Sequence, residues 1–190
     1  MQTNILWTGI AYHSLENCVL THSDESLEVN SVIVGANDDK IYKIDYSIKA
    51  NRSWECIFFE VNTQLYDKKE TINYHSDGRG NWTKNGVPSV EFKGCIDIDI
   101  SLTPFTNSLP INRLQWELNK PQLIKVLFLD ILSQEVVAVQ QRYTKLSNTE
   151  YKFENVPNDF EAIITVDESG MVVNYPDLFV RRRKRHYEEY

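Results

Sequence analysis

Apolar and polar residues alternate along much of this chain, a pattern typical of half-buried β-strands. The clearest example is segment 41–48, in which Tyr42, Ile44, Tyr46 and Ile48 alternate with polar residues. Because successive side chains of a strand point to opposite faces, this pattern predicts one face in the core and one in water. No segment has a sustained period of 3.6 residues, so we expect little helix.

Further strands are expected where β-branched and aromatic residues gather between turn residues. They cover segments 15–21, 27–34, 54–61, 64–74, 95–100, 123–132, 135–143, 151–153, 160–166 and 171–175. Asn85-Gly86 is a strong hairpin signal. Turn residues recur about every ten residues, so the sequence predicts an all-β, antiparallel domain of about ten to eleven strands. A sheet that large should curl into a roll or a partly open barrel, which either fills its interior or encloses a ligand cavity.

The segment from Gly94 to Leu114 joins a strand to a polar loop. Three isoleucines alternate with Asp97 and Asp99, so the two carboxylates should share one face of the strand. Pro104 cannot donate a ladder hydrogen bond, and a second proline follows at position 110, so we expect residues 103–110 to form a shaped loop. A helix over 109–118 would have one or two turns at most.

Length, composition and charge indicate an acidic, single-domain globular protein. The chain has 190 residues, of which 42% are hydrophobic and 12% aromatic, and its net charge is −7. The last ten residues hold five basic and two acidic side chains, so the rest of the chain carries −10. We therefore predict a domain over 1–180 and a basic tail over 181–190. An acidic body argues against nucleic acid as a partner, because phosphate binding needs a basic face.

The tail permits two interpretations. Its basic cluster could contact an anionic membrane surface, where each basic residue contributes about 1 kcal/mol. The interpretation that we favour is a frayed, solvated chain end.

The cysteines and the N-terminal residues bear on location. Cys18, Cys56 and Cys95 lie far apart and form no C-x-x-C motif, which favours reduced thiols in a reducing compartment. The first residues have no basic region followed by a long apolar run, so we expect neither a signal peptide nor a transmembrane segment. These observations predict a cytoplasmic protein.

Four further motifs accompany the central one, which reads Gly94-Cys95-x-Asp97-x-Asp99-x-x-x-Thr103-Pro104-Phe105-Thr106-Asn107-x-Leu109-Pro110-Ile111-x-Arg113-Leu114. They are Glu16, Asp77-Gly78-x-Gly80-x-Trp82, Gln141-x-Tyr143-Thr144-x-Leu146 and Val166-Asp167-x-x-Gly170-x-Val172-x-x-Tyr175-Pro176-x-Leu178-Phe179. Together they resemble the signature of a bacterial family described as putative glycolipid-binding proteins, whose function is uncharacterised. The chain departs from that pattern at Ser14, where the family has glycine, and at Asn112, where it has arginine. The resemblance implies a spiral β-roll similar to that of bacterial lipoprotein-carrier proteins, and a glycolipid or related amphiphile as ligand.

Nine residues are candidates for a ligand site: Glu16, Trp82, Asp97, Asp99, Thr103, Asn107, Arg113, Gln141 and Tyr143. Carboxylates could accept hydrogen bonds from sugar hydroxyls or, with neighbouring oxygens, hold a divalent ion. Alternatively, Asp97 and Asp99 lie on the solvent face of an amphipathic strand. Arg113 could bind an anion, or form a salt bridge with one aspartate that pins the loop.

The remaining candidates also have two interpretations each. Trp82 and Tyr143, like Tyr175, could stack on sugar rings or belong to the core. Gln141 could face a cavity or bond to the backbone.

Three functions remain open. The first, which we favour, is a protein that binds an amphiphile in a cavity with a polar head-group site. The second is a small metal- or carboxylate-dependent hydrolase acting on a phosphorylated or sugar substrate. The third is a structural domain in which the central motif only fastens the fold. No nucleophile elbow, P-loop or metalloprotease motif is present, so we assign no catalytic residue, metal or cofactor.

Overall fold

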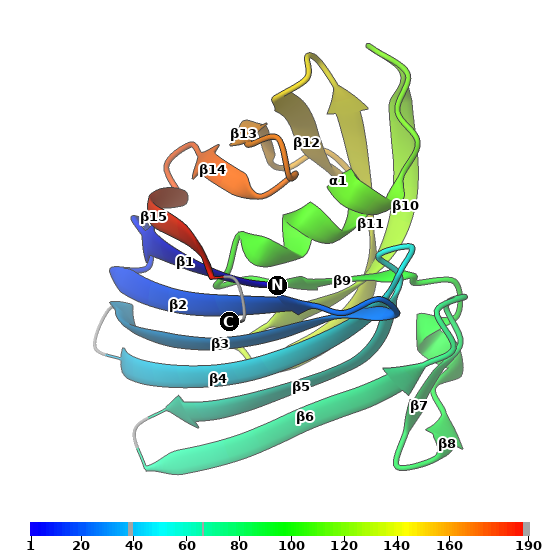
Figure 1. Cartoon of the computed structure of the whole chain (residues 1–190). Helices are drawn as coiled ribbons and strands as arrows, with labels where there is room; N and C mark the ends of the chain where they lie inside the picture. Colours follow the sequence, from blue (N-terminus) through cyan, green and yellow to red (C-terminus); the bar gives the residue numbers. More distant parts are fainter. Residues whose placement is uncertain (38–39, 66, 188–190) are drawn as a thin grey trace.

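A computed structural model describes residues 1–37, 40–65 and 67–187 of the chain (Figure 1). Within these residues the chain forms one continuous sheet of 15 strands in the order β8-β7-β6-β5-β4-β3-β2-β1-β15-β14-β13-β12-β11-β10-β9. Strand neighbours are antiparallel, except that β9 runs parallel to β10. The order begins at β8 and ends at β9, so the sheet has two edges and is not closed into a barrel.

The strands are β1 (Gln2–Gly9), β2 (Ser14–His22), β3 (Ser26–Asn37), β4 (Lys40–Asn51), β5 (Cys56–Leu65), β6 (Lys68–Ser76), β7 (Trp82–Lys84), β8 (Val87–Pro88), β9 (Asp97–Ile100), β10 (Pro121–Asp130), β11 (Glu135–Lys145), β12 (Glu150–Val156), β13 (Glu161–Val166), β14 (Val172–Tyr175) and β15 (Phe179–Tyr187). Two 3-10 helices, η1 (Val90–Phe92) and η2 (Phe105–Asn107), and one α-helix, α1 (Ser108–Arg113), complete the described elements. The all-β prediction with little helix is confirmed, but the predicted number of strands was too low.

The basic C-terminal segment accounts for part of that difference. It forms β15, which pairs with β1 along its whole length, so the interpretation of a frayed end is wrong for residues 181–187. Asp167 lies beside this strand and accepts hydrogen bonds from Arg181 and from Lys184 Nζ at 2.9 Å. These bonds and the backbone ladder with β1 keep the segment in the sheet, although its basic composition suggested a tail. Residues 188–190 lie outside the described part of the chain.

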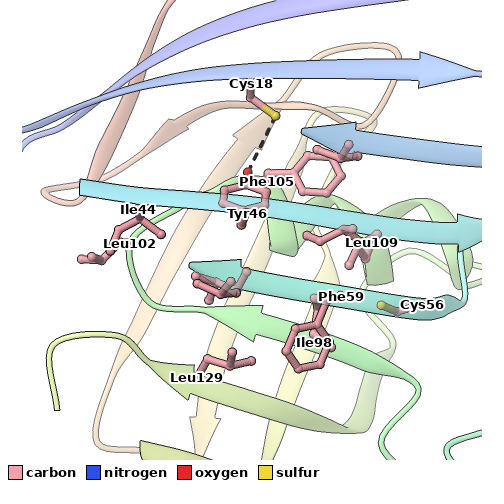
Figure 2. Close-up of a cluster of buried hydrophobic side chains, with 14 of the residues drawn as sticks. Cys18, Ile44, Tyr46, Cys56, Phe59, Ile98, Leu102, Phe105, Leu109 and Leu129 are labelled. Carbon is pink, nitrogen blue, oxygen red and sulfur yellow. Dashed lines mark hydrogen bonds between the residues drawn. The ribbon is translucent and has the colours of Figure 1, made fainter. Parts of the chain in front are cut away.

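The sheet bends around two hydrophobic cores. The large core lies against β1–β6 and includes Trp7, Phe59 and Ile98. Figure 2 shows its centre, where side chains from the sheet meet those of the segment from Gly94 to Leu114, called the central segment below. The small core lies against β10–β15 and includes Tyr143, Phe153, Tyr175 and Phe179, with Ile111 of α1.

Strand β10 separates the two cores and contacts both. Leu127 and Leu129 belong to the large core, whereas Ile124 and Val126 belong to the small core. Both faces of this strand are therefore buried, which explains why its sequence is a nearly continuous apolar run rather than an alternating one.

The central segment fills the space inside the curved sheet. In Figure 1, η2 and α1 lie between the strands β1–β5 and the wall formed by β10–β14. The expected loop over 103–110 is therefore largely helical and buried. Pro104 precedes η2, and Pro110 lies in the first turn of α1, where the missing backbone N–H would have no partner within the helix. These prolines start helical turns rather than a loop.

Candidate ligand-binding site

Strand β9 determines where the two aspartates point. Its parallel ladder pairs Asp97 with Val126 and Asp99 with Phe128 on β10. Ile98 belongs to the large core, so the aspartates point to the opposite side, toward the small core. Asp97 is fully buried and Asp99 is partly buried. The interpretation that these carboxylates face solvent is therefore wrong.

Asp97 forms a buried ion pair with Arg113 of α1. The guanidinium donates from Nε to Oδ1 at 3.0 Å and from Nη2 to Oδ2 at 2.5 Å. Burial raises the pKa of Asp97, and the bonds from Arg113 oppose that rise. The side chains are only 1% and 13% exposed, so the pair fastens α1 onto β9 and the guanidinium is already occupied.

Asp99 has different partners. Its Oδ1 accepts a hydrogen bond from Thr106 Oγ1 at 3.1 Å, and its Oδ2 accepts one from Gln141 Nε2 at 2.6 Å. Burial raises the pKa of Asp99, and both hydrogen bonds lower it. Thr106 Oγ1 also accepts from the Ile100 backbone N–H at 3.3 Å, so this network links β9 to η2 and β11.

A pocket of about 320 Å³ opens beside Asp99. Its polar side also includes Ser101, Thr103 and Asn107 of the central segment, with Asn155 of β12. Its aromatic walls are Tyr12, Phe128, Phe153, Phe160, Tyr175 and Phe179. Asp99 is the single charged residue of the lining. The pocket therefore combines one carboxylate with hydroxyl and amide groups and a wall of rings.

Glu16 lies behind the pocket wall in a buried polar cluster. Its Oε1 accepts hydrogen bonds from Ser31 Oγ at 2.8 Å, Tyr46 OH at 2.6 Å and Thr103 Oγ1 at 2.9 Å. Its Oε2 is buried and has no hydrogen-bond partner among the described residues. Burial raises the pKa of Glu16 to about 7, and the three hydrogen bonds only partly oppose that rise.

The structure brings most of the predicted residues together, in different roles. Asp99, Thr103 and Asn107 line the pocket. Gln141 lines an adjacent pocket of about 220 Å³, and the two pockets share Phe128 and Asn155.

The other predicted residues stand behind the lining or away from it. Glu16 accepts a hydrogen bond from Thr103 behind the lining, and the Asp97–Arg113 pair joins β9 to α1 within the central segment. Tyr143 OH accepts a hydrogen bond from Asn107 Nδ2 at 2.9 Å. Trp82 is remote from the pocket. It lies in the large core and donates from Nε1 to the Cys95 carbonyl at 2.7 Å.

The sequence did not identify most of the aromatic wall. Tyr175 was considered for stacking, but Tyr12, Phe128 and the neighbouring pair Phe153 and Phe160 come from three distant parts of the chain. The high aromatic content was the only available signal, and it does not say which rings meet. Asn155, the polar residue shared by both pockets, carried no signal at all.

The described residues hold neither a metal-ligand cluster nor a membrane-spanning helix. Among residues 1–37, 40–65 and 67–187, no group of three or more His, Cys, Asp or Glu side chains is placed to hold a metal ion. The same part of the chain contains no helix that is both long and apolar enough to cross a bilayer.

Comparisons with known proteins agree with the sequence resemblance. A family model described as "Putative glycolipid-binding" matches residues 4–181. A solved structure of a DUF1089 family protein from Pseudomonas aeruginosa is similar, with a TM-score of 0.81 and 29% sequence identity. The similarity covers 88% of this chain and 92% of that one. No curated protein matches the chain.

Proposed function

The chain belongs to the family described as "Putative glycolipid-binding", and on that premise we propose that it binds a small amphiphile, such as a glycolipid, in the pocket beside Asp99. The observation that carries this proposal is the position of the Asp99 carboxylate at the edge of a pocket walled by aromatic rings. Rings pack against apolar chains and the C–H faces of sugars, and a carboxylate accepts hydrogen bonds from hydroxyls.

The size of the pocket limits what it holds. Its volume of about 320 Å³ is at the lower end of the roughly 300–1,000 Å³ that is usual for small-molecule sites. A head group with the start of a chain, or one short chain, fits such a volume. A complete lipid with two long chains would have to extend beyond it. The adjacent pocket, which shares Phe128 and Asn155, supports such an extension.

Two groups of the central motif have different roles in this proposal. Asp99, Thr103 and Asn107 contact the ligand, because they line the pocket. The Asp97–Arg113 pair positions the segment that carries them. A hydrolase has less support, because Asp99 lines the pocket while the Glu16 and Asp97 carboxylates do not.

A pair of matched phenylalanine variants tests the proposal. Phe160 is half-buried in the pocket wall, and Phe58 is half-buried on β5, beside His75 and outside the pocket lining. Aromatic contacts contribute about 0.5–1.5 kcal/mol beyond area burial, so Phe160→Ala should weaken binding of octyl glucoside about tenfold. Phe58→Ala should leave it within about twofold. Isothermal titration below the micellar concentration measures both, and equal effects of the two variants would contradict the assigned pocket.

We also propose a cytoplasmic, reducing location. Cys18, Cys56 and Cys95 are free and buried, and burial raises the pKa of each thiol. Buried protonated thiols suit a compartment in which disulfides do not form. Fractionation of the native cell with an antibody against the chain tests this, and recovery outside the cytoplasm would refute it.

A further inference from the structure

We infer that the pocket selects a head group that carries no negative charge and donates hydrogen bonds to Asp99. This inference rests on the proposed function, since it specifies the chemistry of the ligand in the same pocket. Two independent properties of the lining support it: its charge and the direction of its hydrogen bonds.

The lining contains no positively charged side chain that could bind an anionic head group. Asp99 is its single charged residue, and none of the lining residues is Lys, Arg or His. The arginine of the same motif, Arg113, is bidentate to Asp97 and nearly buried. A phosphate, sulfate or carboxylate entering the pocket would therefore meet a carboxylate with no compensating cation in the lining. Repulsion and the loss of hydration would both oppose its binding.

The hydrogen bonds of the lining leave acceptors for the ligand. Thr103 gives its hydroxyl proton to Glu16, and the amides of Asn107 and Asn155 each give one of their two N–H hydrogens, to Tyr143 OH and to Asp159 Oδ1. Asp99 accepts one hydrogen bond at each oxygen, from Thr106 Oγ1 and from Gln141 Nε2, neither of which lines this pocket. A carboxylate oxygen has two acceptor sites, so each oxygen can accept one further hydrogen bond. The complementary ligand group is a donor.

The rest of the lining is consistent with this chemistry. Tyr12, Tyr175 and Ser101 are hydroxyl residues, which can donate or accept but cannot neutralise an anion. The faces of aromatic rings are electrically negative, so they attract ammonium groups and polarised C–H groups. Hydroxylated sugars and primary ammonium head groups share the required properties.

Three probes with one common chain test the inference. Octyl glucoside, octylammonium and octyl phosphate are titrated into the full chain at pH 7.5 and 150 mM salt, each below its micellar concentration. We expect octyl glucoside, octylammonium or both to bind at least about tenfold more tightly than octyl phosphate. Tight binding of the glucoside alone assigns the donor to hydroxyls, and tight binding of octylammonium alone assigns it to an amine.

Two other outcomes are distinguishable failures. Octyl phosphate binding as tightly as the best of the other probes would overturn the inference and leave the amphiphile proposal standing. If none of the three probes binds, both proposals fail together.

A charge-neutralising variant gives a second test. Asp99→Asn keeps the shape of the side chain and removes its charge, so the ratio of octyl phosphate affinity to octyl glucoside affinity should rise about tenfold. Asp45→Asn is the matched control, since Asp45 is 42% exposed and pairs with Lys43 on β4, outside the pocket lining. An unchanged ratio in a folded Asp99→Asn protein would contradict the inference. If this variant does not fold, the probe ratios of the unmodified chain decide.

Discussion

The buried carboxyl group of Glu16 should make the stability of this protein depend on pH, and Glu16→Gln should remove that dependence. Gln keeps an oxygen that accepts the hydrogen bonds from Ser31, Tyr46 and Thr103. It replaces the unpartnered Oε2 with an amide group that cannot ionise. The new buried N–H groups have a cost of about 1–3 kcal/mol, but this cost is the same at every pH.

The direction and size of this change in the free energy of unfolding follow from the pKa of Glu16. Folding raises it from 4.5 to about 7. Below pH 4.5 the carboxyl is protonated in both states and the full stability is present. Between pH 4.5 and 7 the unfolded chain has released a proton that the folded chain still holds, so the free energy of unfolding falls as pH rises. At about 1.4 kcal/mol per pKa unit, the loss is about 3 kcal/mol and is complete above pH 7.

Urea unfolding at pH 5 and pH 8 measures this effect. The free energy of unfolding of Glu16→Gln minus that of the unmodified chain should increase by about 2.5 kcal/mol between the two pH values, because a small part of the loss has already occurred at pH 5 and all other groups cancel in the difference. Glu28→Gln on β3 is the control. Its carboxylate is 46% exposed and pairs with Lys49 at 2.8 Å, so the difference should stay within about 1 kcal/mol. A parallel pH response of Glu16→Gln and the unmodified chain would refute the reasoning.

Three further predictions follow from the same structure. Arg113→Ala should destabilise the fold by about 3–5 kcal/mol in urea unfolding, because it leaves the Asp97 carboxylate buried without its partner; a stable variant that only binds octyl glucoside less tightly would instead favour a direct ligand role for Arg113. Trp82→Phe should lower the free energy of unfolding by about 1–3 kcal/mol, since the buried Cys95 carbonyl loses its donor, and titration should show unchanged octyl glucoside affinity. The acidic chain, with a net charge of −7, should not shift duplex DNA in a gel at physiological salt, and a shift at micromolar protein would contradict that expectation.

Local sequence patterns determined much of the fold. The alternation in segment 41–48 lies in β4, where the alternating residues Tyr42, Ile44, Tyr46 and Ile48 are buried. The Asn85-Gly86 turn connects β7 to β8 as a hairpin. Both patterns are local, because strand alternation and turn geometry depend on a few adjacent residues. The central motif also indicated a region that borders a pocket, since Asp99, Thr103 and Asn107, with Ile100 and Ser101 between them, line it.

The tertiary structure decided what each face of β9 meets. The alternation of isoleucine and aspartate predicted two different faces, but not that both are covered. Asp97 is buried because Arg113 approaches it from α1, and Asp99 is at the pocket because β10 and the small core lie on that side. Both facts depend on residues that are distant in sequence, which periodicity does not record.

The same reason explains β15 and the aromatic wall. Five basic residues in succession read as a tail, and only pairing with β1 at the opposite end of the chain makes them a strand. The rings of the pocket come from β10, β12, β14, β15 and two connecting segments. Sequence by itself determined most of the strands and their two unlike faces; the packing of distant strands decided which polar face borders a pocket, because burial is a property of the partners and not of the pattern.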